Sequence, residues 1–224
     1  MTYSGTMNNV STLAHELGHA YHTAMVDDLP YMAQQYRMNV AETASTFAEQ
    51  IISDALLEMS RTKEERRHIL AERIQRSLIF FMNIHARFLF ETQFYEKRKT
   101  GFLSSQDLCD LMQRAQQEAF CNRLSVWHPY FWISKMHFYF TGVPFYNFPY
   151  AFGYLFSLGL YSLSQEKGAA FGAAYDALLR ETGMLSVEDL AQKHLGIDLT
   201  KPDFWEKSMA CVVKDVEEFN KLST

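Results

Sequence analysis

The stretch LAHELGHAYH, residues 13–22, decides what kind of fold this chain can adopt. Its apolar residues recur at helical intervals, which predicts a helix that opens at Asn9 or Ser11 and ends near Val26. The neighbours Ala14, Leu17, Gly18 and Ala20 are small or apolar, whereas a solvated helix would carry more charge. We therefore expect a buried helix within a mostly helical protein.

Within that helix, His15, Glu16 and His19 form the pattern HExxH. Histidines four residues apart lie one turn apart on the same face of a helix, so two imidazole nitrogens can converge on one ion. Zinc in hydrolases takes three protein ligands and leaves a fourth position for water, whose pKa falls to about 7. A carboxylate at Glu16 can take the proton of that water. The alternative is two surface histidines beside an acidic neighbour.

A third zinc ligand has to come from elsewhere in the chain. The extended pattern with a third histidine fails, because Met25 stands where that histidine is needed. A carboxylate from the next predicted helix is the remaining option, and Glu42 is the best candidate. Glu42 could instead complete a helix cap after Asn39. Glu49, two turns further on, either orients a ligand or is solvated.

The rest of the chain is also predicted to be helical, with at most a short strand over residues 1–8. Thr62 and Glu65 form a capping box at the start of the longest predicted helix. Neither an internal repeat nor a low-complexity linker interrupts the pattern. The fold class is therefore mainly α and multi-helix, in one unit. The predicted helices are 39–59, 63–99, 105–125, 149–166, 169–182, 186–195 and 202–222.

Composition excludes several functions. The chain has 224 residues, 48% of them hydrophobic, and its net charge of -5 gives no basic surplus for nucleic acid. Three cysteines without a CxxC pair indicate buried, reduced thiols and a cytoplasmic location. The start of the chain has no secretory signal pattern. Residues 138–165 carry no charge, but prolines, glycines and tyrosines interrupt them, so we expect a cleft-lining segment and no membrane span.

Several motifs together resemble one family. HELGHAYH, NVAETASTFAE, PFYNFPYAFGYLFS and GIDLTKPDFW resemble the thimet oligopeptidase and oligoendopeptidase F peptidases, most closely the oligoendopeptidase F branch. The resemblance covers essentially the whole chain. It implies a zincin-like helical catalytic domain that hydrolyses short peptides with one Zn²⁺ per chain. His15, His19 and Glu42 would be the zinc ligands, and Glu16 the general base.

The resemblance also implies transition-state donors from a later segment. His137, Tyr146 and Tyr150 match these positions, and such donors are worth about 2.7–4 kcal/mol each when tested by removal. Tyr154, one turn further on, is expected to contact the peptide. The alternative is that these rings belong to the core, because the chain contains 12 Tyr and 18 Phe.

Members of this family are usually more than twice this length. The resemblance therefore predicts that residues 1–224 form a single helical catalytic region without the family's N-terminal half, and that residues 3–6 are the remnant of a substrate-binding edge strand. Such a chain would expose apolar surface, so we expect self-association or a missing N-terminal portion. Two alternatives to a peptidase stay open: a catalytically silent zinc-binding fragment, and a metal-free helical interaction module.

Overall fold

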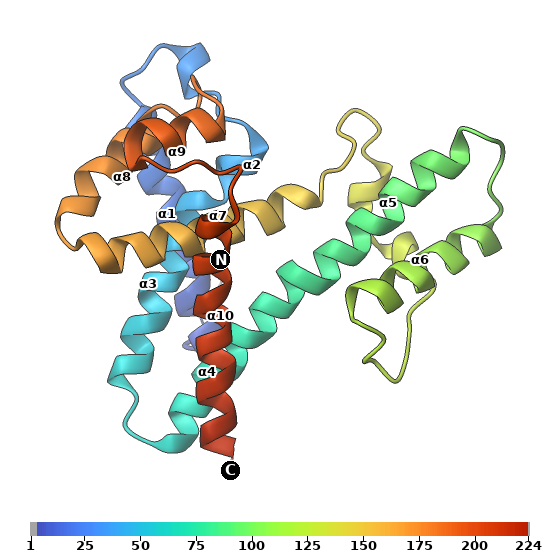
Figure 1. Ribbon diagram of the computed structural model, residues 1–224, viewed down its shortest axis with the longest axis horizontal. Coiled ribbons are helices and arrows are strands. Elements are labelled where there is room, and N and C mark those ends of the chain that lie inside the picture. The colour runs from blue at the N-terminus through green and yellow to red at the C-terminus, as the bar shows by residue number, and fades with distance from the viewer. Residues whose placement is uncertain (1–3, 224) are drawn as a thin grey trace. The chain divides into compact units, whose positions relative to one another are not determined.

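The computed structural model describes residues 4–223, and these residues contain helices and connections but no β-strand. The mainly α prediction is confirmed. The predicted strand over residues 1–8 is wrong at residues 7 and 8, which begin the first helix, while residues 1–3 lie outside the described part. In chain order, the α-helices are α1 (Met7–Val26), α2 (Met38–Ala41), α3 (Thr43–Met59), α4 (Lys63–Leu78), α5 (Ile84–Arg98), α6 (Ser105–Ala119), α7 (Phe148–Lys167), α8 (Ala170–Arg180), α9 (Val187–Leu195) and α10 (Pro202–Ser223) (Figure 1).

The chain divides into two compact units. The first unit comprises residues 1–74 and 152–224, and the second unit comprises residues 75–151. Each has a core of its own, and they are described separately below. The expectation of a single catalytic region concerns function, so it stays a prediction.

Helix α1 begins earlier than its pattern indicates. Thr6 caps it by accepting a hydrogen bond from the backbone N–H of Asn9, and the Asn9 side chain accepts one in return from the N–H of Thr6. Asn9 therefore lies in the first turn and closes a capping box. Its buried face repeats every four residues, at Ala14, Gly18, His22 and Val26. This face packs mainly against α3 and also meets α8.

The helix predicted over residues 39–59 is interrupted at Glu42. Glu42 ends α2 and precedes α3, with φ of -88° and ψ of 0°. The predicted helix over residues 63–99 is also not uniform, because a π-helical segment, η2 (Ile79–Asn83), separates α4 from α5. Both irregularities leave the apolar periodicity intact, which is why the sequence pattern does not reveal them.

The core of the first unit is built from α2, α3 and α7–α10. Aromatic rings of α3 and α8 stack there, with the centroids of Phe47 and Tyr175 4.7 Å apart. A buried ion network lies beside this core. Arg73 of α4 donates to Asp215 of α10 at 2.8 Å and also to Asp54 of α3. Because the partners come from three helices, this network links α3, α4 and α10.

In the second unit, α5 and α6 pack as a helical hairpin around a small core. The core residues are Phe90, Leu111, Met112 and Ala115. The buried amide of Gln116 binds both the N–H and the C=O of His128, which secures the connection after α6. Three short 3₁₀ segments complete the elements: η1 (Tyr31–Gln34) in the first unit, and η3 (Phe131–Ser134) and η4 (Met136–Tyr139) in the second.

Two composition-based predictions can be compared with the fold. Cys109 is buried as expected, but Cys121 is exposed and Cys211 is half-buried, so the burial prediction is wrong for Cys121. None of the helices within residues 4–223 combines the length and apolarity that a membrane crossing requires.

Candidate metal centre

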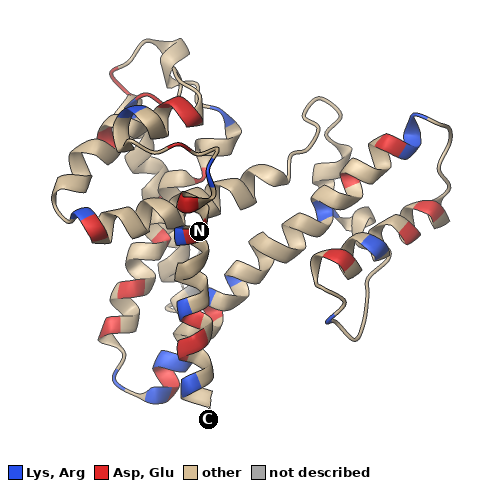
Figure 2. Cartoon of the chain, viewed as in Figure 1, with Lys and Arg blue, Asp and Glu red and all other residues tan. Residues whose placement is uncertain are grey.

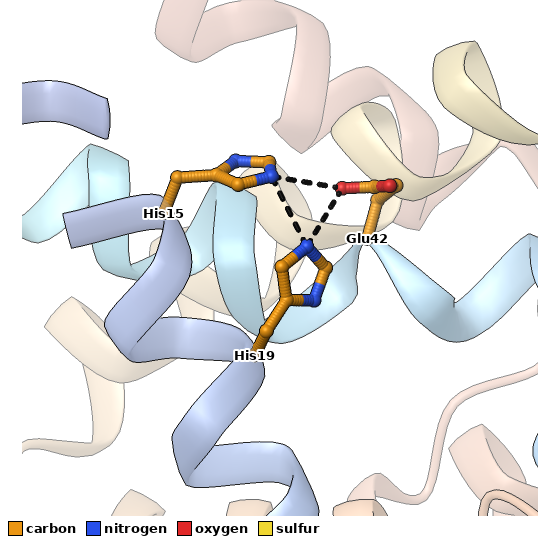
Figure 3. A group of neighbouring side chains, drawn as sticks. All are labelled: His15, His19 and Glu42. Atoms are coloured by element: carbon orange, nitrogen blue, oxygen red, sulfur yellow. Dashed lines mark hydrogen bonds and ion pairs between the residues drawn. The ribbon is translucent and has the colours of Figure 1, made fainter. Parts of the chain in front are cut away.

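Helix α1 brings two imidazoles together. The Nε2 atoms of His15 and His19 are 3.1 Å apart, and the ring planes meet at 83° (Figure 3). Both side chains are about 30% exposed, at 28% and 32%. The convergence follows from the four-residue spacing on one helix. It presents two nitrogens toward the same point while leaving access from solvent.

The third member of the group is Glu42, at the junction of α2 and α3. Its Oε2 atom lies 3.4 Å from Nε2 of His15 and 3.6 Å from Nε2 of His19. The Ser45 hydroxyl lies 2.9 Å from the same Oε2 atom and 3.0 Å from the Glu42 carbonyl oxygen, which fixes the carboxylate. The helix around Asn39 is capped at Arg37 without any side-chain cap hydrogen bond, so the helix-cap alternative for Glu42 is wrong.

The spacing of these three atoms suits a tetrahedral cation. Zinc binds imidazole nitrogen and carboxylate oxygen at about 2.0–2.2 Å, which places neighbouring ligand atoms of a tetrahedron about 3.3–3.6 Å apart. The three separations here are 3.1, 3.4 and 3.6 Å. His15, His19 and Glu42 can therefore hold one divalent cation as three of its ligands.

A second carboxylate orients the first histidine. Oε1 of Glu49 lies 2.6 Å from Nδ1 of His15, and the Glu49 side chain is only 12% exposed. This hydrogen bond raises the pKa of His15, while burial acts in the opposite direction. In the neutral ring, Nδ1–H donates to Glu49 and the Nε2 lone pair faces Glu42. The sequence is compatible with Glu49 either orienting a ligand or being solvated, and the structure shows the contact that orients His15.

Helices α1 and α3 approach so closely that glycine is required at Gly18. A Cβ atom there would lie 2.4 Å from the carbonyl oxygen of Ala44 and 2.5 Å from Cα of Ser45. Gly153 of α7 meets Glu42 in a similar way, because its Cβ would lie 3.1 Å from that of Glu42. Neither this close approach nor the need for glycine at position 18 was predicted from the sequence. The signal for this glycine is the small residue inside HExxH itself.

The sequence also missed the role of His22. This side chain is fully buried, and its Nε2 atom lies 2.8 Å from the hydroxyl of Thr182. Because that hydroxyl donates to the Leu179 carbonyl, Nε2–H of His22 is the donor to Thr182. The ring stacks on Tyr36 with centroids 4.0 Å apart. Burial lowers the pKa of His22 to about 4, so the ring is neutral and serves the packing of α1.

Two further predicted residues belong to the first unit. Glu16 follows His15 on α1, and its side chain is exposed. Its negative charge contributes, as the smallest of several causes, to the raised pKa of His15. Tyr154 of α7 is only 6% exposed, and its contact with a peptide stays a prediction.

The remaining predicted residues cluster in the second unit. The ring of His137 lies 5.2 Å from that of Tyr146 and 6.0 Å from that of Tyr150, measured between centroids. Phe145, just before Tyr146, has a left-handed φ of 58°. The Phe145 N–H donates to the buried Glu91 carboxylate at 2.7 Å, which holds this turn. The structure thus gathers the predicted residues into two sets, one in each unit.

The chain belongs to a family of peptidases. The family model "Peptidase family M3" matches residues 1–211, which is nearly the whole chain. The resemblance inferred from the motifs is therefore confirmed, and homologous oligopeptidases support the assignment of the chain to this class.

Individual relatives place the chain within that family. It is 29% identical over 160 residues to an oligoendopeptidase F homolog of Lactococcus lactis subsp. lactis, covering 69% of this chain and 26% of the relative. It is 24% identical over 228 residues to the chromosomal oligoendopeptidase F of Lactococcus lactis subsp. cremoris, covering 99% of this chain and 37% of the relative. The crystal structure of oligoendopeptidase-F from Enterococcus faecium shares the fold with a TM-score of 0.77 at 22% identity, covering 97% of this chain and 40% of that one. The chain therefore spans between a quarter and two fifths of these proteins.

Proposed function

We propose that this chain is the catalytic region of a zinc-dependent endopeptidase that hydrolyses short peptides. The observation that carries the proposal is the convergence of two imidazole nitrogens and one carboxylate oxygen within 3.1–3.6 Å of one another. His15, His19 and Glu42 would hold the ion. When bound, zinc lowers the pKa of a water and polarises the scissile carbonyl group.

The residues of the chain supply the proton transfers. The exposed Glu16 carboxylate, next to His15 on α1, accepts a proton from the attacking water and passes it to the leaving amine. Glu49 holds His15 in the tautomer whose Nε2 can act as a ligand. His137, Tyr146 and Tyr150 are proposed as donors to the oxyanion that forms on the carbonyl. The three free thiols support the cytoplasmic location.

A replacement of Glu16 tests the proposal. The variant Glu16→Gln keeps the size of the side chain but removes the base, so it should bind one zinc per chain and lose turnover of an internally quenched peptide by about 100-fold or more. Glu58→Gln, on the exposed surface of α3, is the matched control and should retain turnover. Full turnover by pure Glu16→Gln protein would overturn the role of Glu16.

A second function is a catalytically silent zinc-binding fragment. It is favoured by one observation, namely that all three candidate ligands belong to the first unit, so zinc binding does not require the predicted donors of the second unit. This alternative predicts one zinc per chain without cleavage of any short peptide. Measuring zinc content and peptide cleavage on the same preparation distinguishes the two functions.

A further inference from the structure

The second unit contains two cations without a carboxylate partner. Arg87 of α5 donates only to neutral groups, from Nε to Oδ1 of Asn83 at 2.9 Å and from Nη1 to Oδ1 of Asn147 at 3.1 Å. Its guanidinium carbon also lies 5.3 Å from the ring centroid of Phe131. Lys135 places its Nζ 4.7 Å from the same centroid. Across residues 4–223, no ion pair involves either side chain.

The nearest acidic residue along α5 does not neutralise Arg87. Glu91 lies one turn further on, but its Oε1 atom accepts the N–H of Phe145. Burial raises the pKa of Glu91, while its hydrogen bonds with the Phe145 N–H and Asn147 act in the opposite direction. Burial also lowers the pKa of Arg87, as expected for a cation removed from water without an anionic partner. Among the described residues, Arg87 thus forms no ion pair with a carboxylate.

The charge distribution of the sequence around Arg87 and Lys135 also favours an anionic ligand. The second unit has eight Lys and Arg against five Asp and Glu, a net charge of +3, although the whole chain carries -5. Residues 119–165 contain no Asp or Glu, and the connection between α6 and α7 carries no acidic residue in Figure 2. A partly buried cation without a counter-charge is costly, so an anionic ligand would stabilise this arrangement.

One of these cations lies beside the segment that carries the predicted donors, because Arg87 donates to Asn147, the residue after Tyr146. Arg87 and Lys135 both act on His137, whose pKa is lowered first by burial and then by these two charges. The His137 ring packs beside Tyr146 and Tyr150. Tyr150 also raises the pKa of Arg87, against the larger effect of burial. His137 thus packs against two phenol rings, and two nearby cations act on its pKa. This donor set suits a carboxylate, which accepts hydrogen bonds at both oxygens.

We propose that Arg87 and Lys135 bind a carboxylate group of the peptide ligand and so make acidic or free-acid peptides the preferred class. The identification of the ligand as a peptide rests on the proposed function, whereas the anion site rests on the geometry of the second unit alone. The carboxylate can come from the C terminus of the peptide or from an acidic side chain. Both sources offer the same planar pair of oxygens to the guanidinium.

Titration calorimetry of the full chain, after chelator treatment to prevent turnover, tests the site. The probes are tetraalanine with a free C terminus, tetraalanine amide, and the amide of Ala-Ala-Glu-Ala. We expect the free acid to bind about tenfold more tightly than the amide. Tight binding of the Glu-containing amide would assign the site to side-chain carboxylates, and weak binding would assign it to the C terminus.

Matched variants show whether these two cations are responsible. Arg87→Gln retains an amide donor toward Asn147 but removes the charge, and Lys135→Gln removes the second charge; each should abolish the tenfold preference. Arg98→Gln and Lys99→Gln, at the end of α5, remove charges from the same unit and should retain it. If Arg87→Gln fails to fold, Lys135→Gln decides, because within residues 4–223 the Lys135 side chain makes no hydrogen bond to another element that its loss would break.

Equal binding of acid and amide by the native chain, or no measurable binding of either, overturns the proposal. An equal loss in Arg98→Gln overturns it as well, because it would reflect net charge alone. The titration needs neither zinc nor turnover, so its failure leaves the proposed peptidase function standing. Conversely, loss of zinc binding would refute that function without changing this result.

Discussion

Replacing Gly18 by alanine should separate α1 from α3 and disturb the proposed metal site. The added Cβ would lie 2.4 Å from the Ala44 carbonyl oxygen and 2.5 Å from Cα of Ser45. An ordinary carbon contact is about 3.5 Å, so the helices must part by about 1 Å. Both of these contact atoms belong to the backbone, so no change of side-chain rotamer relieves the clash. Such overpacking costs about 1–3 kcal/mol, offset by up to about 1 kcal/mol of better helix propensity.

The metal site should be more sensitive than the fold. His15 and His19 belong to α1 and Glu42 to the start of α3, and their ligand atoms are 3.1–3.6 Å apart. A shift of about 1 Å between the helices exceeds the tolerance of bonds of about 2.0–2.2 Å. We expect zinc affinity to fall by about 10- to 100-fold, measured by competition with a chelating dye.

Gly172 provides the matched control for this experiment. It lies within α8, and a Cβ there would have no neighbour within 4 Å. Gly172→Ala should therefore gain up to about 1 kcal/mol in urea unfolding and keep its zinc affinity. If Gly18→Ala matched Gly172→Ala in both measurements, the close approach of α1 and α3 would be refuted.

Three further perturbations test other parts of the structure. Because the pKa of His22 falls to about 4, the unfolded chain binds a proton that the folded chain does not between pH 6.5 and 4, so acid destabilises the fold. Urea unfolding of the metal-free chain should lose about 2 kcal/mol more between pH 7 and pH 5 than that of His22→Gln; identical pH dependence would contradict this. Arg73→Met leaves Asp215 buried without its partner and should cost about 3–5 kcal/mol in the same assay, so a loss under 1 kcal/mol would show that the pair is solvated. Glu49→Gln weakens the hydrogen bond that orients His15 and should reduce zinc affinity by about tenfold, and unchanged affinity would argue against that orienting role.

Periodicity predicted the helices well because the sequence signals that specify a helix are local. The apolar repeat of α1 and the Thr62–Glu65 capping box depend on neighbours within one turn, and the capping box is confirmed. The break at Glu42 was missed, since Val40, Ala44 and Phe47 keep their helical spacing across it. At the break, Glu42 meets Gly153 of α7, a contact with another helix that periodicity cannot reveal.

The site shows the same division between local and tertiary information. His15 and His19 could be paired from sequence because one helix carries both. Glu42 comes from a different segment, and its approach to the two histidines depends on the packing of α3 against α1, which periodicity does not specify. No sequence pattern singles out Arg87. Its role as an anion site depends on its spatial neighbours being neutral groups, which only the structure shows.

X-ray absorption at the zinc edge of the loaded chain tests the central claim most directly. The account predicts a first shell of nitrogen and oxygen atoms at about 2.0–2.2 Å, including two imidazoles, and no sulfur. Replacement of Glu42 by Gln should lengthen or remove one of these distances. A sulfur neighbour at about 2.3 Å, or a shell of water oxygens without imidazole, would contradict it.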